Sequence, residues 1–359
     1  MKRAGKNGRY TYEEIMTQSG LWDEVIAATK SQWSRLATLF NTADRVVFTG
    51  CGSNYYMSLG AAFHFRALTG MNAAGVPASE LLLYPGAILR GKGRTLVVTL
   101  CRSGETTEVV KAVEAVHRRP GVETLYLGCA PDSTVAGMCS ASLAFPKAKD
   151  RSVVTTRSHT AMLVAAQTIA GLAAGASGEA YLREIERLPG LGRGLPERFE
   201  EAVEQIPVER YGQFVFLGSG PFYGIACEGM LKMKEMALVP SDGFHVLEFR
   251  HGPKSILDGS VLVIVFLSDT GRDEEMRLVQ ELGDLGGAVL TVCEHSPPEA
   301  QRGRASAGTD YLAETGSRIS ELARSVLYLP AAQLLAFFKA ASQDIDVDSP
   351  RHLSYHVSL

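Results

Sequence analysis

The hydrophobic pattern of the chain changes its period near residue 44. From Tyr10 to Leu39 apolar side chains recur at helical spacing without strand-like alternation, which predicts N-terminal helices. Beyond this stretch, short runs of β-branched and aromatic residues alternate with longer Ala-rich segments. Such alternation predicts an α/β fold in which helices cover both faces of parallel strands. The predicted strands begin at or near Arg45, Leu96, Thr124, Gln213, Val261 and Ala288.

The second half of the chain repeats the first. Residues 213–223 align with residues 45–55 at a constant offset of 168 positions (213 minus 45), and the later strands repeat at nearly the same offset. Leu-Ala-Phe-Pro at 143–146 has a similar counterpart in Leu-Tyr-Leu-Pro at 327–330, and each precedes an Ala-rich helix. We therefore predict two similar α/β domains joined by duplication. The expected division is N-terminal helices over 1–43, a first domain over 44–175, a linker over 176–208, a second domain over 209–345 and a tail over 346–359 that closes the site.

Charge and cysteine content narrow the classes of function. The 359 residues include 36 Lys and Arg against 39 Asp and Glu, a formal net charge of −3, so no general attraction to nucleic acid or anionic membranes is expected. The six cysteines form no C-x-x-C pair, which is typical of reduced thiols in a cytoplasmic protein. No secretory signal is recognisable, and the uncharged stretches 46–65 and 158–178 are too polar to span a membrane.

Two polar turns of the first half follow predicted strands. Residues 50–54 read Gly-Cys-Gly-Ser-Asn, and residues 101–107 read Cys-Arg-Ser-Gly-Glu-Thr-Thr. In parallel sheets ligands bind beyond the carboxyl ends of the strands, where hydroxyls and unpaired N–H groups at helix starts suit a phosphate monoester. The alternative is that the hydroxyls only cap helices. A Rossmann dinucleotide site is disfavoured because the first turn lacks the third glycine of G-x-G-x-x-G.

The second half contains a dense group of ionisable residues. Helical spacing places Glu228, Lys232 and Glu235 on one face. A solvated salt-bridge stripe would explain this pattern, and a single histidine is more often structural than functional. However, the following segment places His251 beside a Gly-Pro turn, in a loop where side chains can converge on a ligand.

Six motifs in order now identify a resemblance. They are Gly-Cys-Gly-Ser (50–53), Ser-Gly-Glu-Thr (103–106), Ser-Val-Val-Thr-Thr-Arg-Ser (152–158), Glu-Gly-x-x-Lys-x-Lys-Glu (228–235), Glu-x-x-His-Gly-Pro (248–253) and Asp-Val-Asp-x-Pro-Arg (346–351). From about residue 20 to the end, the chain resembles the sugar isomerase (SIS) family, in the double-domain architecture of the isomerase half of glucosamine-6-phosphate synthase and of stand-alone amino-sugar phosphate deaminases and isomerases. The resemblance implies two tandem SIS domains, each a flavodoxin-like three-layer sandwich.

The resemblance also implies roles for particular residues. Glu235 would be the general base that moves a proton between C1 and C2 of the sugar, and His251 would assist ring opening. In the family this histidine comes from the partner subunit, so an obligate homodimer is implied. Lys232 and Glu228 would organise the helix and the substrate, and neither a metal nor a redox cofactor is needed. The remaining positions for the phosphate and the sugar would be Ser53, Cys101, Arg102, Ser103, Thr106, Thr155 and Tyr355.

Three departures from the synthase bear on the reaction. Lys2 stands where its glutaminase domain has a nucleophilic Cys, so glutamine is not the expected nitrogen source. Arg102 replaces a Gln, and its guanidinium could bind phosphate or a substrate carboxylate. Tyr355 aligns with the lysine that is a Schiff-base candidate for the ketose. Both the missing domain and the missing lysine argue against synthesis.

The expected function is that of a cytoplasmic phosphosugar isomerase/deaminase. Its substrate would be an amino-sugar phosphate such as glucosamine 6-phosphate, and its products fructose 6-phosphate and ammonia. Alternatives are a ketose/aldose phosphate isomerase, a fructosamine-type 6-phosphate deglycase and, less favoured, a non-catalytic phosphosugar sensor. Specificity is expected to depend on a loop at 241–247 and on the tail that carries His352 and Tyr355; a metal site at His352 and His356 is not expected.

Overall fold

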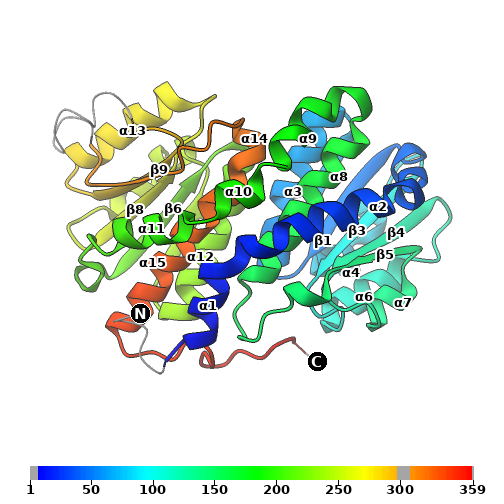
Figure 1. Cartoon of the computed structure of the whole chain (residues 1–359), viewed down its shortest axis with the longest axis horizontal. Helices are drawn as coiled ribbons and strands as arrows, with labels where there is room; N and C mark the ends of the chain where they lie inside the picture. Colours follow the sequence, from blue (N-terminus) through cyan, green and yellow to red (C-terminus); the bar gives the residue numbers. More distant parts are fainter. Residues whose placement is uncertain (1–6, 297–307, 358–359) are drawn as a thin grey trace. The chain divides into compact units, whose positions relative to one another are not determined.

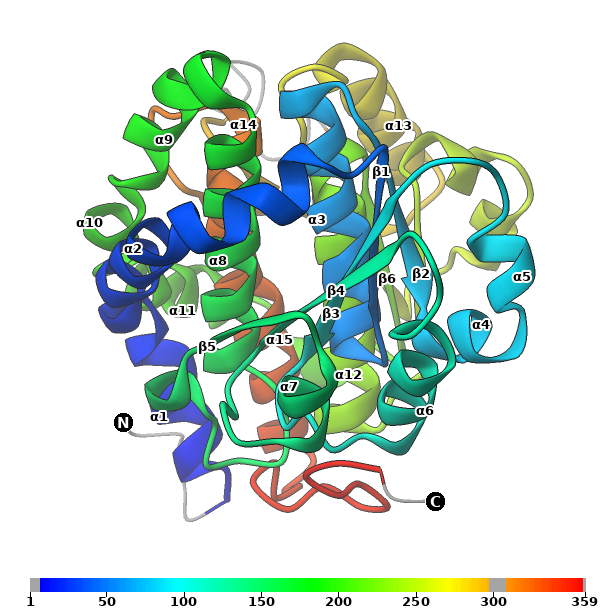
Figure 2. The same ribbon diagram turned by 90° about the vertical axis from the view of Figure 1, so that its right-hand side faces the viewer.

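The structure is a computed structural model that describes residues 7–296 and 308–357. The chain divides into two compact units. The first unit comprises residues 18–151, 155–189 and 354–359, and the second comprises residues 1–17, 152–154 and 190–353. Figures 1 and 2 show that each unit is built around a sheet with helices against it. The short segments 152–154 and 354–359 belong to a different unit from the residues directly before them. The units are therefore not continuous in sequence, and the domain boundaries given above stay predictions.

The first unit contains a five-stranded parallel sheet with the order β2-β1-β3-β4-β5. All seven residues of the central strand β3 are buried, as expected for a strand whose two faces are both covered. The sheet consists of β1 (Arg45–Gly50), β2 (Asn72–Pro77), β3 (Thr95–Cys101), β4 (Val122–Gly128) and β5 (Ala141–Ala144).

Helices cover both faces of this first sheet. On one face Val47 and Val97 pack with apolar residues of α4, α6 and α7. On the other face Phe48 contacts Phe65 of α3, and the Trp22 indole of α2 donates a hydrogen bond to Thr160 of α8. The helices of this unit are α2 (Trp22–Asn41), α3 (Ser53–Thr69), α4 (Ala78–Leu83), α5 (Pro85–Ile88), α6 (Thr107–Val116), α7 (Thr134–Met138), α8 (Arg157–Ala173) and α9 (Glu179–Ile185).

The second unit contains another five-stranded parallel sheet, with the order β10-β9-β8-β6-β7. Helix α13 packs on one face. On the other face lies α12, where Gly229 is close to the Phe216 ring and to Ala332 of α15. The strands are β6 (Gln213–Gly218), β7 (Ser241–Phe244), β8 (Val261–Phe266), β9 (Ala288–Cys293) and β10 (Tyr311–Glu314). The helices are α1 (Arg9–Thr17), α11 (Leu195–Val203), α12 (Tyr223–Ala237), α13 (Arg272–Asp284), α14 (Glu321–Arg324) and α15 (Leu329–Ser342), and α10 (Leu188–Gly192) lies where the chain passes between units.

The duplicated pattern is confirmed at the level of strands. The first strands of the two sheets, β1 and β6, keep the offset of 168 (213 minus 45). Helices are present within residues 9–41, as predicted, and within residues 176–208. The role of residues 176–208 as a linker stays a prediction. One expectation was wrong: Ser241–Phe244 is the edge strand β7, not part of a loop. Leu327 to Pro330 leads into the Ala-rich helix α15, as the sequence predicted. In the second sheet the counterpart of β5 is β10.

One helical stretch of the described residues, Glu321–Ser342, is long and apolar enough to be considered as a membrane span. Of its most apolar window, 89% is buried inside the structure. The stretch therefore packs as a core helix in the second unit. All six cysteines are free, as the sequence predicted.

Candidate functional site

The first candidate cluster lies at the carboxyl ends of β1 and β3. There α3 starts at Ser53, and α6 starts directly after Thr106. In neither helix does an N-cap side chain accept a hydrogen bond, whereas Ser133 caps α7 by accepting from the N–H of Ala136. The first N–H groups of a helix have no partner within the helix. The Thr106 side chain therefore does not cap α6, and the N–H of Thr107 is bound instead by the carbonyl oxygen of Val357. The N–H groups that follow at the start of α6 favour an anion.

The loop after β3, residues 101–106, is called the β3 loop below. Its Cys101 Sγ accepts a hydrogen bond from the N–H of Gly104 at 3.2 Å, and it lies 3.7 Å from Thr106 Oγ1 and 3.8 Å from Ser103 Oγ. Gly104 has a φ of +65°, and a Cβ there would lie 1.9 Å from Ser133 Oγ. Only glycine fits this position. The loop thus brings together three of the predicted phosphate-binding side chains.

The acidic residue of the Ser-Gly-Glu-Thr motif is bound elsewhere. The Glu105 carboxylate accepts hydrogen bonds from the N–H of Thr134 at 2.8 Å and from its hydroxyl at 2.7 Å. These two bonds lower the pKa of Glu105. The carboxylate is thereby held against the start of α7.

Arg102 has protein partners on two sides. Its Nη1 lies 3.2 Å from Asp150 Oδ2, and its Nη2 donates to the carbonyl oxygen of Tyr355 at 2.8 Å. The guanidinium carbon lies 3.9 Å from the centre of the Tyr355 ring. Sequence reasoning missed Asp150, which lies two residues before the 152–158 motif. Of the other predicted residues in this unit, Ser53 is buried, and Thr155 is half-buried in the segment that precedes α8.

The second candidate cluster lies on α12, in the second unit. Lys232 Nζ is 3.3 Å from Glu228 Oε1 and donates a hydrogen bond to Glu235 Oε2. The side chains of Lys232 and Glu228 have no exposed surface, whereas that of Glu235 is 21% exposed. This group is therefore not a solvated salt-bridge stripe. Its one partly exposed carboxylate is the residue predicted to be the base.

The two neighbouring carboxylates keep Lys232 charged. Burial by itself would lower the pKa of Lys232, but the carboxylates of Glu228 and Glu235 outweigh burial and raise it. A lysine with a raised pKa remains an ammonium group at neutral pH. Its ammonium group binds the Glu235 carboxylate directly.

His251 stands apart from the α12 cluster. It follows a short 3-10 helix, Leu247–Arg250, and its N–H donates to the carbonyl oxygen of Glu248 at 3.0 Å. Gly252, with a φ of +110°, turns the chain after it. The imidazole is exposed, and within the described part of the chain no hydrogen bond or ion pair connects it with Lys232 or Glu235.

The second unit has a loop that matches the β3 loop. In this β8 loop, residues 267–271, Ser268 Oγ accepts from the N–H of Gly271 at 2.9 Å, as Cys101 Sγ accepts from Gly104. Here a carboxylate of the same unit is already bound. Glu321 Oε2 accepts from the N–H of Asp269 at 2.7 Å and of Thr270 at 3.2 Å, and Oε1 accepts from the Thr270 hydroxyl.

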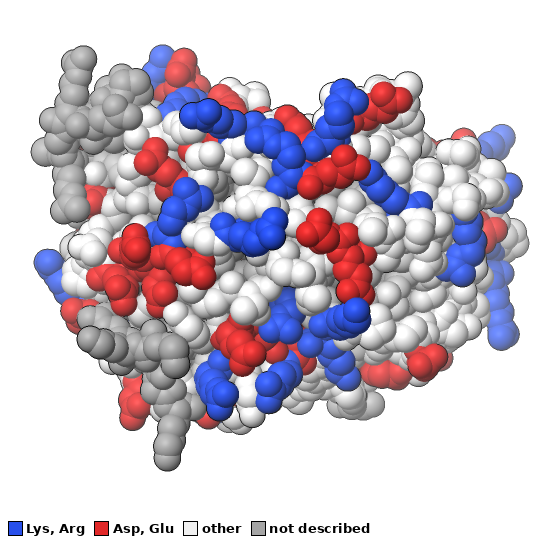
Figure 3. Space-filling view, in the orientation of Figure 1, with Lys and Arg blue, Asp and Glu red and all other residues white. Residues whose placement is uncertain are grey.

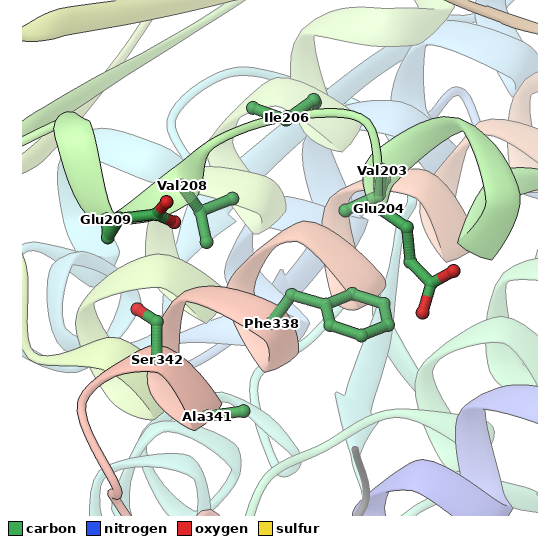
Figure 4. Close-up of a pocket in the computed structure, with 8 residues that line it drawn as sticks. All are labelled: Val203, Glu204, Ile206, Val208, Glu209, Phe338, Ala341 and Ser342. Atoms are coloured by element: carbon green, nitrogen blue, oxygen red, sulfur yellow. The ribbon is translucent and has the colours of Figure 1, made fainter. Parts of the chain in front are cut away.

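A hollow of about 390 Å³ in the second unit lies away from the predicted side chains. Figure 4 shows Phe338 and Ser342 of α15 facing the segment from Val203 to Glu209. Two carboxylates, Glu204 and Glu209, are among its lining residues, so this hollow does not suit a phosphate.

Neither surface charge nor metal-binding groups point to a further candidate site among the described residues. On the face in Figure 3, acidic and basic side chains are interspersed, so anion binding would have to rely on local groups. Among residues 7–296 and 308–357, no group of three or more His, Cys, Asp or Glu side chains is arranged to hold a metal ion.

Comparisons with known proteins agree with this picture. The family model for the SIS domain matches residues 39–171. The chain is 28% identical over 328 residues to the glutamine–fructose-6-phosphate aminotransferase (isomerizing) of Clostridium perfringens, covering 89% of this chain and 52% of that protein. It thus spans about half the length of the curated relatives that it matches.

Solved structures show the same fold over nearly the whole chain. Glucosamine-6-phosphate deaminase from Thermotoga maritima is 27% identical with a TM-score of 0.78, and the match covers 98% of this chain and 100% of that one. Tagatose-6-phosphate ketose/aldose isomerase from Escherichia coli, 24% identical, has a TM-score of 0.81 with coverage of 95% and 96%. Residues 39–171 therefore match the SIS domain, and 89% of the chain is similar to about half of an isomerizing aminotransferase.

Proposed function

We propose that the chain is a phosphosugar isomerase/deaminase with two tandem SIS domains, and that its substrate is an amino-sugar phosphate such as glucosamine 6-phosphate. The observation that carries the proposal is the α12 cluster, in which a buried lysine forms an ion pair with one partly exposed carboxylate, that of Glu235. The similarity to a glucosamine-6-phosphate deaminase over nearly the whole chain supports the substrate class. The hydroxyls of the β3 loop, together with the start of α6, where the Thr106 side chain does not cap the helix, would bind the phosphate.

The proposed reaction begins with ring opening to the 2-amino aldehyde. The Glu235 carboxylate takes the proton from C2, which gives an enolamine, and the resulting carboxylic acid returns a proton to C1. The product is an imine at C2. Water adds to this imine, and ammonia leaves, so that fructose 6-phosphate remains.

Solvent-deuterium exchange at C2 of glucosamine 6-phosphate, together with an ammonia assay, tests the proposal. We expect the wild type to exchange the C2 proton and release ammonia, and Glu235→Gln to do neither. Glu274→Gln, which removes an exposed carboxylate of the second unit, is the matched control and should behave as the wild type. Exchange at full rate in Glu235→Gln would remove Glu235 from the role of base. Ketose formation from an aldose phosphate without ammonia release would favour the simple isomerase instead.

We also propose that the protein acts as a homodimer in which His251 serves the partner's site. The exposed imidazole and the lack of a bond to the α12 cluster support this view. Mixing two inactive variants, Glu235→Gln and His251→Ala, tests it. In a mixed dimer one site would combine an intact Glu235 with the intact histidine of the other subunit, so we expect activity to return. If the mixture stays inactive although mixed dimers form, His251 does not act across an interface.

A further inference from the structure

A short segment of the tail, residues 354–357, lies against the start of α6. The N–H of Thr107 donates to the carbonyl oxygen of Val357 at 3.1 Å, and the Thr107 hydroxyl lies 3.4 Å from the same oxygen. Thr107 is the first residue of α6, so the tail segment is bound directly beside the β3 loop. All of these residues belong to the first unit.

Arg102 is the residue that holds this tail segment. It donates to the Tyr355 carbonyl oxygen and stacks on the Tyr355 ring, while Lys149 Nζ lies 5.2 Å from the centre of the same ring. A planar guanidinium can donate along its edge and stack with its face at the same time, which an ammonium group cannot do. The two contacts with Tyr355 therefore require an arginine at position 102, and a lysine of the same charge would not make both.

Asp150 fixes Arg102 from the other side. Its side chain has no exposed surface, and its Oδ1 accepts from the N–H of Thr156 at 3.3 Å and of Ser158 at 3.2 Å. These residues belong to the 152–158 motif at the start of α8. The Arg102–Asp150 ion pair thus connects the β3 loop, this motif and the tail segment, which all carry predicted site residues.

We propose that Arg102 is a positioning residue, not a ligand of the substrate. Held by Asp150, it seats the tail segment through Tyr355, and the seated segment forms one wall of the anion site at the start of α6. The seating of the tail does not depend on the reaction proposed above. Only its effect on turnover rests on that proposed function.

Hydrogen exchange of the purified full chain, followed by mass spectrometry, tests the seating. In the wild type we expect slow exchange of the Thr107 amide and slow tryptic cleavage after Arg351. Arg102→Lys and Tyr355→Ala should both accelerate exchange and cleavage at least fivefold, and the double variant should be no faster than the single ones, because both act on one interaction. Tyr355→Phe keeps the ring and should match the wild type, as should Arg118→Gln, an exposed arginine of the same unit.

Unchanged exchange in both Arg102→Lys and Tyr355→Ala would overturn the proposal. Arg102→Gln is less suited to the test, because it leaves the buried Asp150 without its cation and could unfold the unit. For an active enzyme we expect Tyr355→Ala to raise KM at least fivefold with kcat within twofold. A large fall of kcat in Tyr355→Phe would also overturn it, because the hydroxyl would then act in the chemistry. If no sugar phosphate is turned over, the proposed function fails, but the exchange data still decide whether Arg102 seats the tail.

Discussion

The β3 loop and the β8 loop occupy matching places in the repeat but differ in what they bind. Both follow the central strand of their sheet, and both are closed by a bond from a glycine N–H to the side chain of Cys101 or Ser268. In the β8 loop the donors of Asp269 and Thr270 are taken by the Glu321 carboxylate. In the β3 loop the motif's own acid, Glu105, is bound to Thr134.

The difference in what the two loops bind indicates that the two repeats have different roles. The β8 loop shows that a loop of this shape can hold an oxyanion, and there the anion is part of the protein. In the β3 loop no carboxylate of the described residues occupies the corresponding place, and the partner of the Thr107 N–H is the uncharged carbonyl oxygen of Val357. This loop therefore remains the candidate for an external phosphate. Conversely, the buried ion cluster lies on α12, in the unit whose loop is closed. The candidate phosphate loop thus belongs to the first unit and the candidate base to the second.

The largest expected effect is on kcat, from a substitution in the α12 cluster. Glu235→Gln should lower kcat by about 10²- to 10⁴-fold, because it removes the carboxylate that moves the proton. Phosphate affinity should stay unchanged, since the β3 loop is intact. Steady-state kinetics and calorimetric titration check the two parts. Loss of phosphate binding in this variant would show that the division between the units is wrong.

Removal of the buried lysine should mainly affect stability. Lys232→Met leaves Glu228 with a buried charge and no cation, which should cost about 3–5 kcal/mol of the free energy of unfolding. Lys234→Met, an exposed lysine on the same helix, is the matched control and should change stability by less than about 0.5 kcal/mol. Urea unfolding measures both. Equal effects of the two variants would contradict the role given to Lys232.

Removing one hydroxyl from each loop tests which loop binds phosphate. Ser103→Ala should weaken phosphate binding about tenfold, the effect of losing one hydrogen bond to a charged group. Thr270→Val removes the corresponding hydroxyl of the β8 loop, which donates to Glu321, and should leave phosphate affinity unchanged. Titration with inorganic phosphate gives both values. The comparison fails if Thr270→Val weakens binding as much as Ser103→Ala does.

The smallest expected effect is a pH dependence in the second unit. Burial would raise the pKa of Glu294, but hydrogen bonds from Ser317, Thr315 and the N–H of Arg318 outweigh it and lower the pKa. A lowered carboxyl pKa contributes stability above the unfolded value of about 4.3, and this contribution disappears as the pH falls through the folded value. The stability difference between the wild type and Glu294→Gln should therefore shrink from about pH 5 downward in urea unfolding. A difference that grows on acidification would contradict the assignment.

The sequence was most informative about buried strands and glycine turns. Apolar runs such as Val261–Phe266 and the repeated Gly-x-Gly turn predicted the central strands and the duplication, because a strand covered on both faces has few polar positions. The edge strands β2 and β7 were missed, since Asn72–Pro77 and Ser241–Phe244 are only partly buried and lack such runs.

The sequence predicted which ionisable residues of α12 share one face, but it did not predict the residues that connect the candidate positions of the first unit. Spacing alone places Glu228, Lys232 and Glu235 on one face, because helical geometry is local. The Arg102–Asp150 pair joins residues 48 positions apart, and its bond to Tyr355 spans 253 positions. Such contacts depend on how the whole unit folds, so no local pattern identifies them.

The stoichiometry of sugar-phosphate binding tests the central claim most directly. Calorimetric titration of Glu235→Gln with glucosamine 6-phosphate avoids turnover and counts the sites. We predict one site per chain, weakened by adding Ser103→Ala and unaffected by adding Thr270→Val. Two equivalent sites per chain, or a single site that depends on Thr270 and not on Ser103, would contradict the account.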